Sequence, residues 1–217
     1  DIDSAAREIK KFQENNNVPN VNIDRNSIDG RTTMKNYLTV IGGGYRNYKN
    51  SLGLLGKTVI LGVAATWNEK RKGLSDYLKL AEILDEKYKI ILVGLTKNQK
   101  NKLPEKILGI ERTNNIEELA KIYSAADLFV NFSYSDNYPT VNLEAVACGT
   151  PVLTYNSGGS PESALNGIVI PRGDLEAAVK EIKNYFDGKN KPEIIFDRSE
   201  FDHKKTLTEY LKLIRSE

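Results

Sequence analysis

From Thr58 onward, short apolar runs alternate with segments in which apolar residues recur at helical spacing. Uninterrupted apolar runs of this length are expected of strands that are covered on both faces of a sheet. We expect strands over 59–64, 89–94, 106–110, 126–131, 151–155 and 167–170. The amphipathic segments predict helices over 74–84, 116–123, 140–148, 175–186 and 206–214. Strands that alternate with helices in this way predict an α/β fold, a doubly wound parallel sheet with helices on both faces.

The composition changes near residue 50. Residues 1–50 are rich in asparagine and turn formers, and only 5–12 is expected as a helix and 37–41 as a strand. The glycine run at 42–44 lacks the spacing of a dinucleotide fingerprint and a convincing following helix, so we expect a turn there. We divide the chain into a segment over 1–55 and a domain over 56–217, and the sequence leaves open whether the first is a remnant, a linker or a replacement of another domain.

Composition excludes several classes of function. The formal net charge of +2 argues against a nucleic-acid binder, which normally carries a strong basic excess. The single cysteine, Cys148, and the single histidine, His203, cannot supply a zinc cluster or a disulfide framework. We expect Cys148 to be a packed small hydrophobe rather than a nucleophile. No apolar run approaches the roughly 18 residues of a membrane span, and no signal peptide is visible, so we expect a cytoplasmic protein.

Ligands of doubly wound sheets bind beyond the carboxyl ends of the strands, so the loops there are candidate sites. After the first strand, Arg71 and Lys72 precede Gly73 and the start of a helix. Two cations and the amides of a helix start suit a phosphate or a diphosphate. A solvated basic turn is an equal alternative. In the same loop, Trp67 either stacks on a base or covers the sheet edge, and we favour the second.

After the fourth strand, a polar loop runs into a helix, with Pro139 placed as a first-turn proline. Asp136 lies in this loop, and Glu144 lies eight positions later, on the helix. If the loop folds back over the helix start, the two carboxylates flank one crevice, where their oxygens could accept hydrogen bonds from sugar hydroxyls. Taken alone, a capping Asp136 and an exposed Glu144 are the commoner arrangement.

After the fifth strand, Gly158 and Gly159 would let the backbone approach a ligand closely, and Pro161 could open a short helix. A plain flexible turn would need the two glycines but not the Ser-Pro-Glu that follows them. We therefore count this loop among the candidate binding segments.

Six segments in this order and spacing resemble the donor-binding half of the retaining GT-B glycosyltransferases of family 4 type (glycosyl transferases group 1), a family with many bacterial polysaccharide and capsule enzymes. They are Arg71 to Gly73, Tyr123 to Asp127, Asp136 to Glu144, Ala145 to Val152, Gly158 to Glu162 and Gly167 to Ile170. The resemblance runs from about Lys57 to the C-terminus and implies a Rossmann-like domain, one half of a GT-B fold.

The resemblance implies that a sugar is transferred from a nucleotide-diphospho-sugar, of UDP or GDP type, to an acceptor hydroxyl. Arg71 and Lys72 would neutralise the donor diphosphate, Asp136 would hold the donor sugar, and Glu144 would bind the ribose hydroxyls. Two further groups would surround the donor, namely Asn137, Tyr138, Pro139 and Thr140 near the sugar and phosphates, and Arg112, Thr113 and Asn114 around the nucleobase. No metal and no further cofactor are implied, because cations and helix dipoles take the place of a divalent ion.

The chain also departs from the family pattern. Asp136 replaces a commoner glutamate, and Trp67 stands where many relatives carry an arginine. Asn26 to Asp29 is similar to the Asn-Gly-hydrophobic-Asp sequence that usually precedes the donor domain, with serine for glycine. Residues 1–50 are too few for the acceptor domain that the family normally carries.

Our leading interpretation is a donor-binding domain of an enzyme of polysaccharide or glycoconjugate synthesis, inactive alone. An acceptor glycan or glycolipid would bind through an N-terminal domain missing from this sequence, and peripheral membrane association is expected only in the complete enzyme. Two alternatives remain open. One is a non-catalytic or engineered nucleotide-binding or scaffold module of the same fold, and the other, less favoured, is a sugar-nucleotide epimerase of the same architecture.

Overall fold

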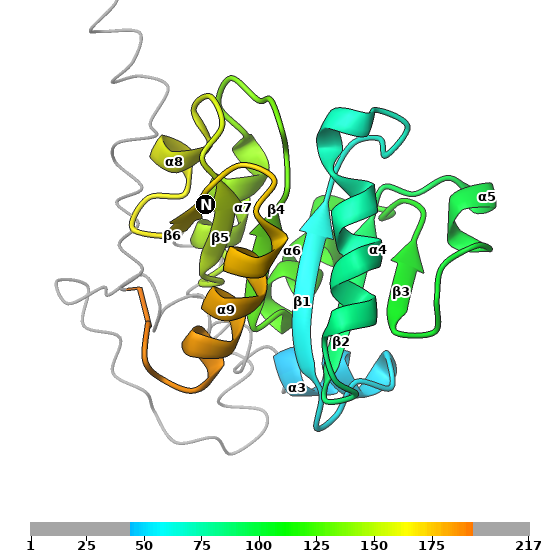
Figure 1. Cartoon of the computed structure of the whole chain (residues 1–217). Helices are drawn as coiled ribbons and strands as arrows, with labels where there is room; N and C mark the ends of the chain where they lie inside the picture. Colours follow the sequence, from blue (N-terminus) through cyan, green and yellow to red (C-terminus); the bar gives the residue numbers. More distant parts are fainter. Residues whose placement is uncertain (1–43, 193–217) are drawn as a thin grey trace, which may run out of the picture.

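The computed structural model describes residues 44–192, which form a parallel sheet between two layers of helices (Figure 1). The sheet has six strands in the order β3-β2-β1-β4-β5-β6. Their bounds are β1 Thr58–Val63, β2 Tyr88–Val93, β3 Ile107–Ile110, β4 Leu128–Asn131, β5 Val152–Tyr155 and β6 Ile168–Ile170. Each strand begins and ends within two residues of its predicted bounds. The predicted fold class, an α/β protein with a doubly wound parallel sheet, is confirmed.

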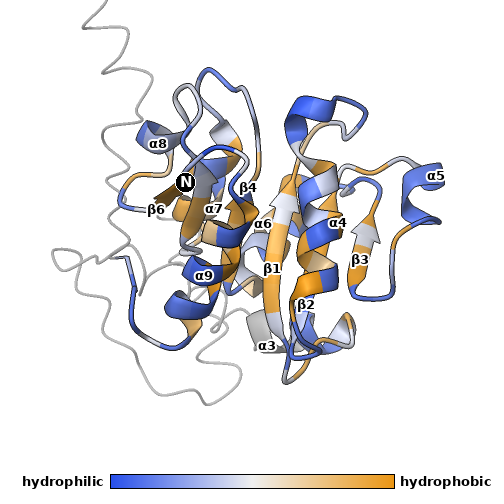
Figure 2. Ribbon diagram, viewed as in Figure 1, coloured by the Kyte–Doolittle hydropathy of each residue, from blue (hydrophilic) through white to orange (hydrophobic). Residues whose placement is uncertain are grey.

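Helices cover both faces of the sheet. On one face lie α4 (Leu74–Ile83) and α9 (Leu175–Phe186), and on the other lie α3 (Gly44–Ser51), α6 (Ile116–Ala125) and α7 (Thr140–Ala147) (Figure 1). Successive side chains of β1 serve opposite layers, because Ile60 packs with the α4 and α9 side while Val59 and Leu61 pack with the α6 and α7 side. In Figure 2 the strands β1, β2 and β3 are mainly hydrophobic, whereas α4 and α9 mix hydrophilic and hydrophobic residues along their length.

Three short helical pieces complete the described chain, the 3-10 turn η1 (Lys70–Lys72), α5 (Lys97–Lys100) and α8 (Ser160–Ser163). The short helix expected at Pro161 is therefore confirmed as α8. The lysine-rich connection after β2 contains a helix that the sequence did not predict, α5. This helix begins with a capping box between Thr96 and Gln99.

The expectation that no helix follows the glycine run at 42–44 is wrong, because α3 begins at Gly44. Little in this polar segment favours a helix on its own, and tertiary contacts hold it. The Lys49 ammonium lies 2.6 Å from the Asp127 carboxylate and donates to the carbonyl of Lys57, while Leu54, just after the helix, is buried. The helices predicted over 5–12 and 206–214 and the strand over 37–41 lie outside the described residues.

The sheet opens where its strand order reverses, between β1 and β4. β1 pairs with β2 along its whole length but with β4 at Ile60 and Leu61 alone. Beyond that point the Tyr77 hydroxyl donates to the carbonyl of Val130, and its ring fills the space that a side chain at Gly62 would need. The carboxyl ends of β1 and β4 therefore separate and leave room for a ligand.

No helix in the described part of the chain is both long enough and apolar enough to cross a membrane.

Candidate functional site

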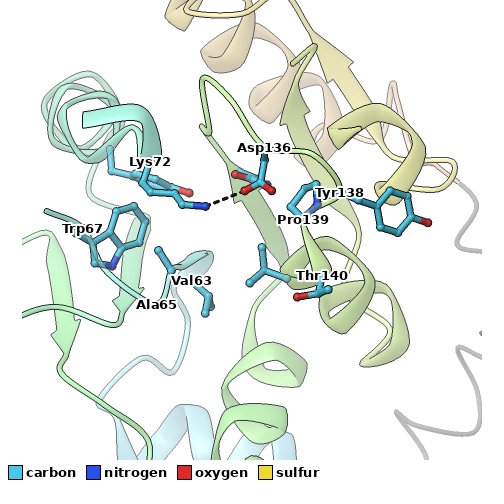
Figure 3. Close-up of a pocket in the computed structure, with 12 residues that line it drawn as sticks. Val63, Ala65, Trp67, Lys72, Asp136, Tyr138, Pro139 and Thr140 are labelled. Carbon is cyan, nitrogen blue, oxygen red and sulfur yellow. Dashed lines mark hydrogen bonds and ion pairs between the residues drawn. The ribbon is translucent and has the colours of Figure 1, made fainter. Parts of the chain in front are cut away.

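A pocket of about 250 Å³ lies where β1 and β4 separate, between the loops that follow the two strands (Figure 3). Its lining comes from Val63, Ala64, Ala65, Trp67, Lys72, Tyr77, Asn131, Asp136, Tyr138, Pro139, Thr140 and Val141. This is the topological switch point of the sheet, the place where open α/β sheets bind their ligands. It is the strongest candidate site in the described residues.

Lys72 and Asp136 face each other across this pocket (Figure 3). The Lys72 ammonium lies 2.7 Å from Oδ2 of Asp136, and each side chain is about one-fifth exposed (22% and 20%). Gly73 makes this approach possible, because its φ of +74° is left-handed and a Cβ there would lie 2.2 Å from the carbonyl oxygen of Phe132. The turn before α4 is thus pressed against the end of β4, which places the cation beside the acid.

The loop that carries Asp136 is fixed on one side by the turn at Arg71. The amide of Tyr134 donates to the carbonyl of Arg71 over 2.7 Å, and Nη1 of Arg71 donates to the carbonyl of Ser135 over 2.9 Å. Nε of Arg71 lies 2.5 Å from the carboxylate of Glu69. The Arg71 guanidinium therefore holds the outside of the loop, and the side chain is not among those that line the pocket.

On the other side, the loop is fixed by the turn after β5. A Cβ at Gly158 would lie 2.0 Å from the carbonyl oxygen of Asp136, and one at Gly159 would lie 2.0 Å from that of Asn137. The Gly159 amide donates to the Asp136 carbonyl over 3.2 Å, and the Ser157 hydroxyl donates to a neighbouring carbonyl of the loop. The close approach that these glycines permit is an approach to the backbone of this loop, and their approach to a ligand stays a prediction.

A buried polar network behind the pocket was not predicted from the sequence. The amide group of Asn142 on α7, fully buried, donates to the carbonyl of Ser160 and the hydroxyl of Ser163, and its oxygen accepts from Asn131. These bonds fix the start of α7 against β4 and α8. Helix α7 begins at Thr140, with Pro139 as the N-cap rather than inside the first turn as predicted. The amides of Thr140 and Val141, in the first turn, have no acceptor within the helix, and both residues line the pocket.

The comparisons with known proteins bear on this arrangement. Residues 57–187, more than half of the 217-residue chain, match the family described as Glycosyl transferases group 1. The chain belongs to this family. Its fold and the matched region are those of the C-terminal domain of a group 1 glycosyltransferase.

Curated relatives of this glycosyltransferase domain align over short stretches. The D-inositol 3-phosphate glycosyltransferase of Mycobacterium sp. (strain KMS) is 44% identical over 52 residues, which is 24% of this chain and 12% of the relative. The enzyme of the same description from Saccharomonospora viridis is 36% identical over 63 residues, 28% of this chain and 15% of the relative. The matched stretches therefore span less than one-sixth of these relatives.

Solved glycosyltransferase structures match over more of the fold. Anabaena HepE, solved in complex with UDP-glucose, superposes with a TM-score of 0.58 at 20% identity, over 69% of this chain and 44% of HepE. WaaG, a glycosyltransferase involved in lipopolysaccharide biosynthesis, gives a TM-score of 0.56 at 22% identity, over 67% of this chain and 42% of WaaG. These likenesses establish the Rossmann-like GT-B fold, and the chain spans less than half of either structure.

Within this glycosyltransferase domain, the structure gathers part of the predicted site. Five of the predicted residues line the pocket, Lys72, Asp136, Tyr138, Pro139 and Thr140. Figure 3 shows the Tyr138 ring directed away from the Lys72–Asp136 pair. The lining does not include the other predicted residues, Arg71, Asn137, Glu144, Arg112, Thr113 and Asn114. The roles of all these residues remain predictions.

The remaining predicted residues have partners of their own. Oε2 of Glu144 accepts the hydroxyl of Tyr123 over 2.9 Å, and burial together with this carboxylate raises the pKa of Tyr123. Asn114, in the loop between β3 and α6, donates from its backbone and side-chain amides to Glu118. Glu144 lies in the second turn of α7, and the 112–114 loop precedes α6, a helix on the same side of the sheet.

Trp67 covers the end of β2, the alternative that we favoured. Its indole Nε1 donates to the carbonyl of Val93 over 2.9 Å, and its ring packs edge-on against Tyr77 at 5.3 Å. Trp67 is 5% exposed, so one wall of the pocket is apolar where it meets the sheet. Among the described residues, no three His, Cys, Asp or Glu side chains are grouped so that they could hold a metal ion.

Proposed function

We propose that the chain is the donor-binding domain of a retaining glycosyltransferase, one that transfers a sugar from a nucleotide-diphospho-sugar to an acceptor hydroxyl in polysaccharide or glycoconjugate synthesis. The observation that carries the proposal is the Lys72–Asp136 pair in the switch-point pocket of a group 1 glycosyltransferase domain. The UDP-glucose complex of HepE, which has a similar fold, adds support.

Lys72 would bind the donor diphosphate. Its ammonium group is held at the pocket by the turn before α4 and is partly desolvated, so its attraction to a phosphate oxygen is stronger than on an open surface. The first amides of α7, at Thr140 and Val141, add the partial positive charge of a helix N-terminus. Together these groups would stabilise the charge that builds up on the leaving diphosphate without a metal or another cofactor.

Asp136 would hold the donor sugar. A carboxylate has two oxygens, so Asp136 can accept a hydrogen bond from a sugar hydroxyl while Oδ2 stays with Lys72. Glu144 would accept from the ribose hydroxyls, and Arg112, Thr113 and Asn114 would lie around the nucleobase. Arg71 would assist at the diphosphate once its bond to the loop is released.

The reaction would break the bond between the sugar C1 and the diphosphate oxygen and form a bond from C1 to the acceptor oxygen on the same face. The acceptor proton would pass to the released diphosphate. The acceptor, a glycan or a glycolipid, would be held by a second domain, and the complete enzyme would act in the cytoplasm with peripheral contact to a membrane. Alone, this domain would bind the donor weakly, because half a cleft leaves the donor in water.

Calorimetric titration with UDP, GDP and their glucose and mannose derivatives tests the proposal. We expect binding of at least one of these ligands, and a loss of about tenfold or more in affinity in Lys72→Ala and in Glu144→Ala. Lys70→Ala is the matched control, since Lys70 is an exposed lysine of the same turn outside the pocket lining. If the folded chain binds none of these nucleotides, the scaffold alternative is favoured instead.

A further inference from the structure

A buried acid, Asp76, joins three elements around the site. It lies in the first turn of α4, four residues after Lys72, and is 4% exposed. Its Oδ2 accepts two hydrogen bonds, one from the hydroxyl of Tyr134 over 2.8 Å and one from the hydroxyl of Tyr155 over 2.9 Å. No ion pair to this carboxylate occurs in residues 44–192. Its Oδ1 accepts a longer bond, 3.5 Å, from the hydroxyl of Ser75, so these three hydroxyls and the N-terminus of α4 compensate its burial.

The two tyrosines lie in different surroundings. Tyr155 ends β5 and is fully buried in the core, where its ring packs against Phe132 at 4.9 Å. Tyr134 belongs to the loop after β4, two residues before Asp136, and its ring meets that of Tyr155 edge-on at 5.4 Å. The hydrogen bond to Asp76 raises the pKa of Tyr134, whereas burial is the larger cause of the raised pKa of Tyr155.

We propose that Asp76 is a positioning residue for the donor site, and that it sets the place of Asp136 by holding Tyr134. Asp76 belongs to the first turn of α4, and Lys72 belongs to the turn directly before that helix. Tyr134 belongs to the same loop as Asp136. One buried carboxylate therefore links the supports of both members of the pair. The bond from Tyr134 to Asp76 joins α4 to the loop, and the bond between Lys72 and Asp136 joins the turn before α4 to the same loop at the pocket.

The alternative is that Asp76 only joins α4 to the sheet. The two tyrosines separate these cases, because both donate to the same oxygen and only one of them belongs to the site loop. Tyr134→Phe and Tyr155→Phe each remove one hydroxyl and keep the ring, so each leaves Asp76 with one donor fewer. If Asp76 only joins α4 to the sheet, the two variants should change the position of the loop that carries Asp136 to the same extent.

Amide hydrogen exchange of the unliganded chain measures how firmly the loop that carries Asp136 is held. The amide of Tyr134 is bonded to the carbonyl of Arg71 and that of Gly159 to the carbonyl of Asp136, so both report on the position of the loop. We expect exchange at residues 134 and 159 to be about tenfold faster in Tyr134→Phe and unchanged in Tyr155→Phe. Asp76→Asn, which weakens both bonds, should accelerate the same two amides. Equal acceleration in both phenylalanine variants, or none in Asp76→Asn, would overturn the proposal.

A binding measurement extends the test to the site and rests on the proposed function. We expect the affinity for UDP-glucose to fall about tenfold in Tyr134→Phe and to change by less than about twofold in Tyr155→Phe. If the unmodified chain binds no UDP-glucose, the proposed function fails for this donor, while hydrogen exchange still decides the role of Asp76. A fall of equal size in both variants would contradict the positioning role.

Discussion

The Lys72–Asp136 pair places one positive and one negative charge together in a partly buried pocket. Each charge is neutralised by the other until a ligand enters. A diphosphate has to share Lys72 with Asp136, whereas a sugar hydroxyl can use the carboxylate without separating the pair. Under the proposed function, we therefore expect the pair to favour a ligand that brings both an anion and hydroxyl groups over a ligand that brings an anion alone.

The Asp136→Asn variant tests this balance of charges. With the acid removed, the Lys72 cation is fully available to phosphate, so we expect UDP to bind about threefold more tightly. The advantage of UDP-glucose over UDP should shrink, because an amide is a weaker acceptor for a sugar hydroxyl. Calorimetry with the two ligands measures both effects. Asp85→Asn, which removes an exposed acid beyond the end of α4, serves as control and should change neither affinity.

Cys148 provides a second prediction at this scale. Burial raises the pKa of its thiol from 9.0 to about 11, and the residue is 7% exposed. The thiol therefore stays protonated at pH 8, and iodoacetamide should modify it slowly in the folded chain and rapidly in denaturant. Mass spectrometry follows the modification. Rapid alkylation without unfolding would show that Cys148 is an exposed, reactive thiol and not a packed hydrophobe.

Some residues of the candidate pocket could be predicted from the sequence because local signals mark them. Lys72 precedes a glycine and a helix start, and Asp136 precedes a proline and a helix start, at the ends of recognisable strands. Asp76 had no such signal, because its two tyrosine partners lie 58 and 79 positions away and depend on how α4 packs on the sheet. The partner of Arg71 was missed for the same reason, since it is a backbone carbonyl of a distant loop.

At the scale of elements, the loop over 133–137 is the most constrained part of the site. The turn at Arg71 binds it on one side and the turn at 157–159 binds it on the other. The sequence predicted a close backbone approach at the Gly158–Gly159 pair, and the structure shows one to the loop over 133–137, while an approach to a ligand stays a prediction. Spacing along a chain can show that glycine is needed for an approach, and it cannot show what approaches.

Gly158→Ala tests this close contact. A Cβ at this position would meet the Asp136 carbonyl oxygen at 2.0 Å, so the variant has to displace the loop or the turn. Gly149→Ala is the matched control, because Gly149 also has a positive φ, +74°, but no atom within 4 Å of its Cβ position. We expect Gly149→Ala to lower the free energy of unfolding by about 1 kcal/mol. Gly158→Ala should lower it by about 3 kcal/mol.

Denaturant titrations give both free energies. Equal losses in the two variants would mean that only the positive φ matters and that the loop yields to the added methyl group. A larger loss in Gly158→Ala would show that the loop carrying Asp136 is held in place by this turn.

At the scale of the whole molecule, strand order creates the pocket. The chain builds β1, β2 and β3 in one direction and then returns to place β4 on the other side of β1. The alternating pattern was enough to predict this sheet, since parallel connections leave few topologies. It was not enough to predict α3, whose polar sequence is helical because Lys49 and Leu54 anchor it to the rest of the fold.

Lys49→Ala tests whether the contacts of α3 contribute to the free energy of unfolding of the whole domain. The Lys49 ammonium lies 2.6 Å from Asp127 and its side chain is 9% exposed, so its loss leaves a partly buried carboxylate with fewer partners. We expect the free energy of unfolding to fall by about 2 kcal/mol. Lys189→Ala removes an exposed ion pair as control and should leave stability unchanged. A Lys49→Ala variant as stable as the unmodified chain would contradict this contribution.

A structure of the chain with a bound nucleotide sugar tests the central claim most directly. Soaking or co-crystallisation with UDP-glucose should place the diphosphate at Lys72 and the start of α7, with a sugar hydroxyl on Asp136. The groove of about 570 Å³ between β6 and α9 is another place where a ligand could bind. If the nucleotide occupies that groove, or binds with neither Lys72 nor Asp136 in contact, the assignment of the donor site to the β1–β4 pocket is wrong.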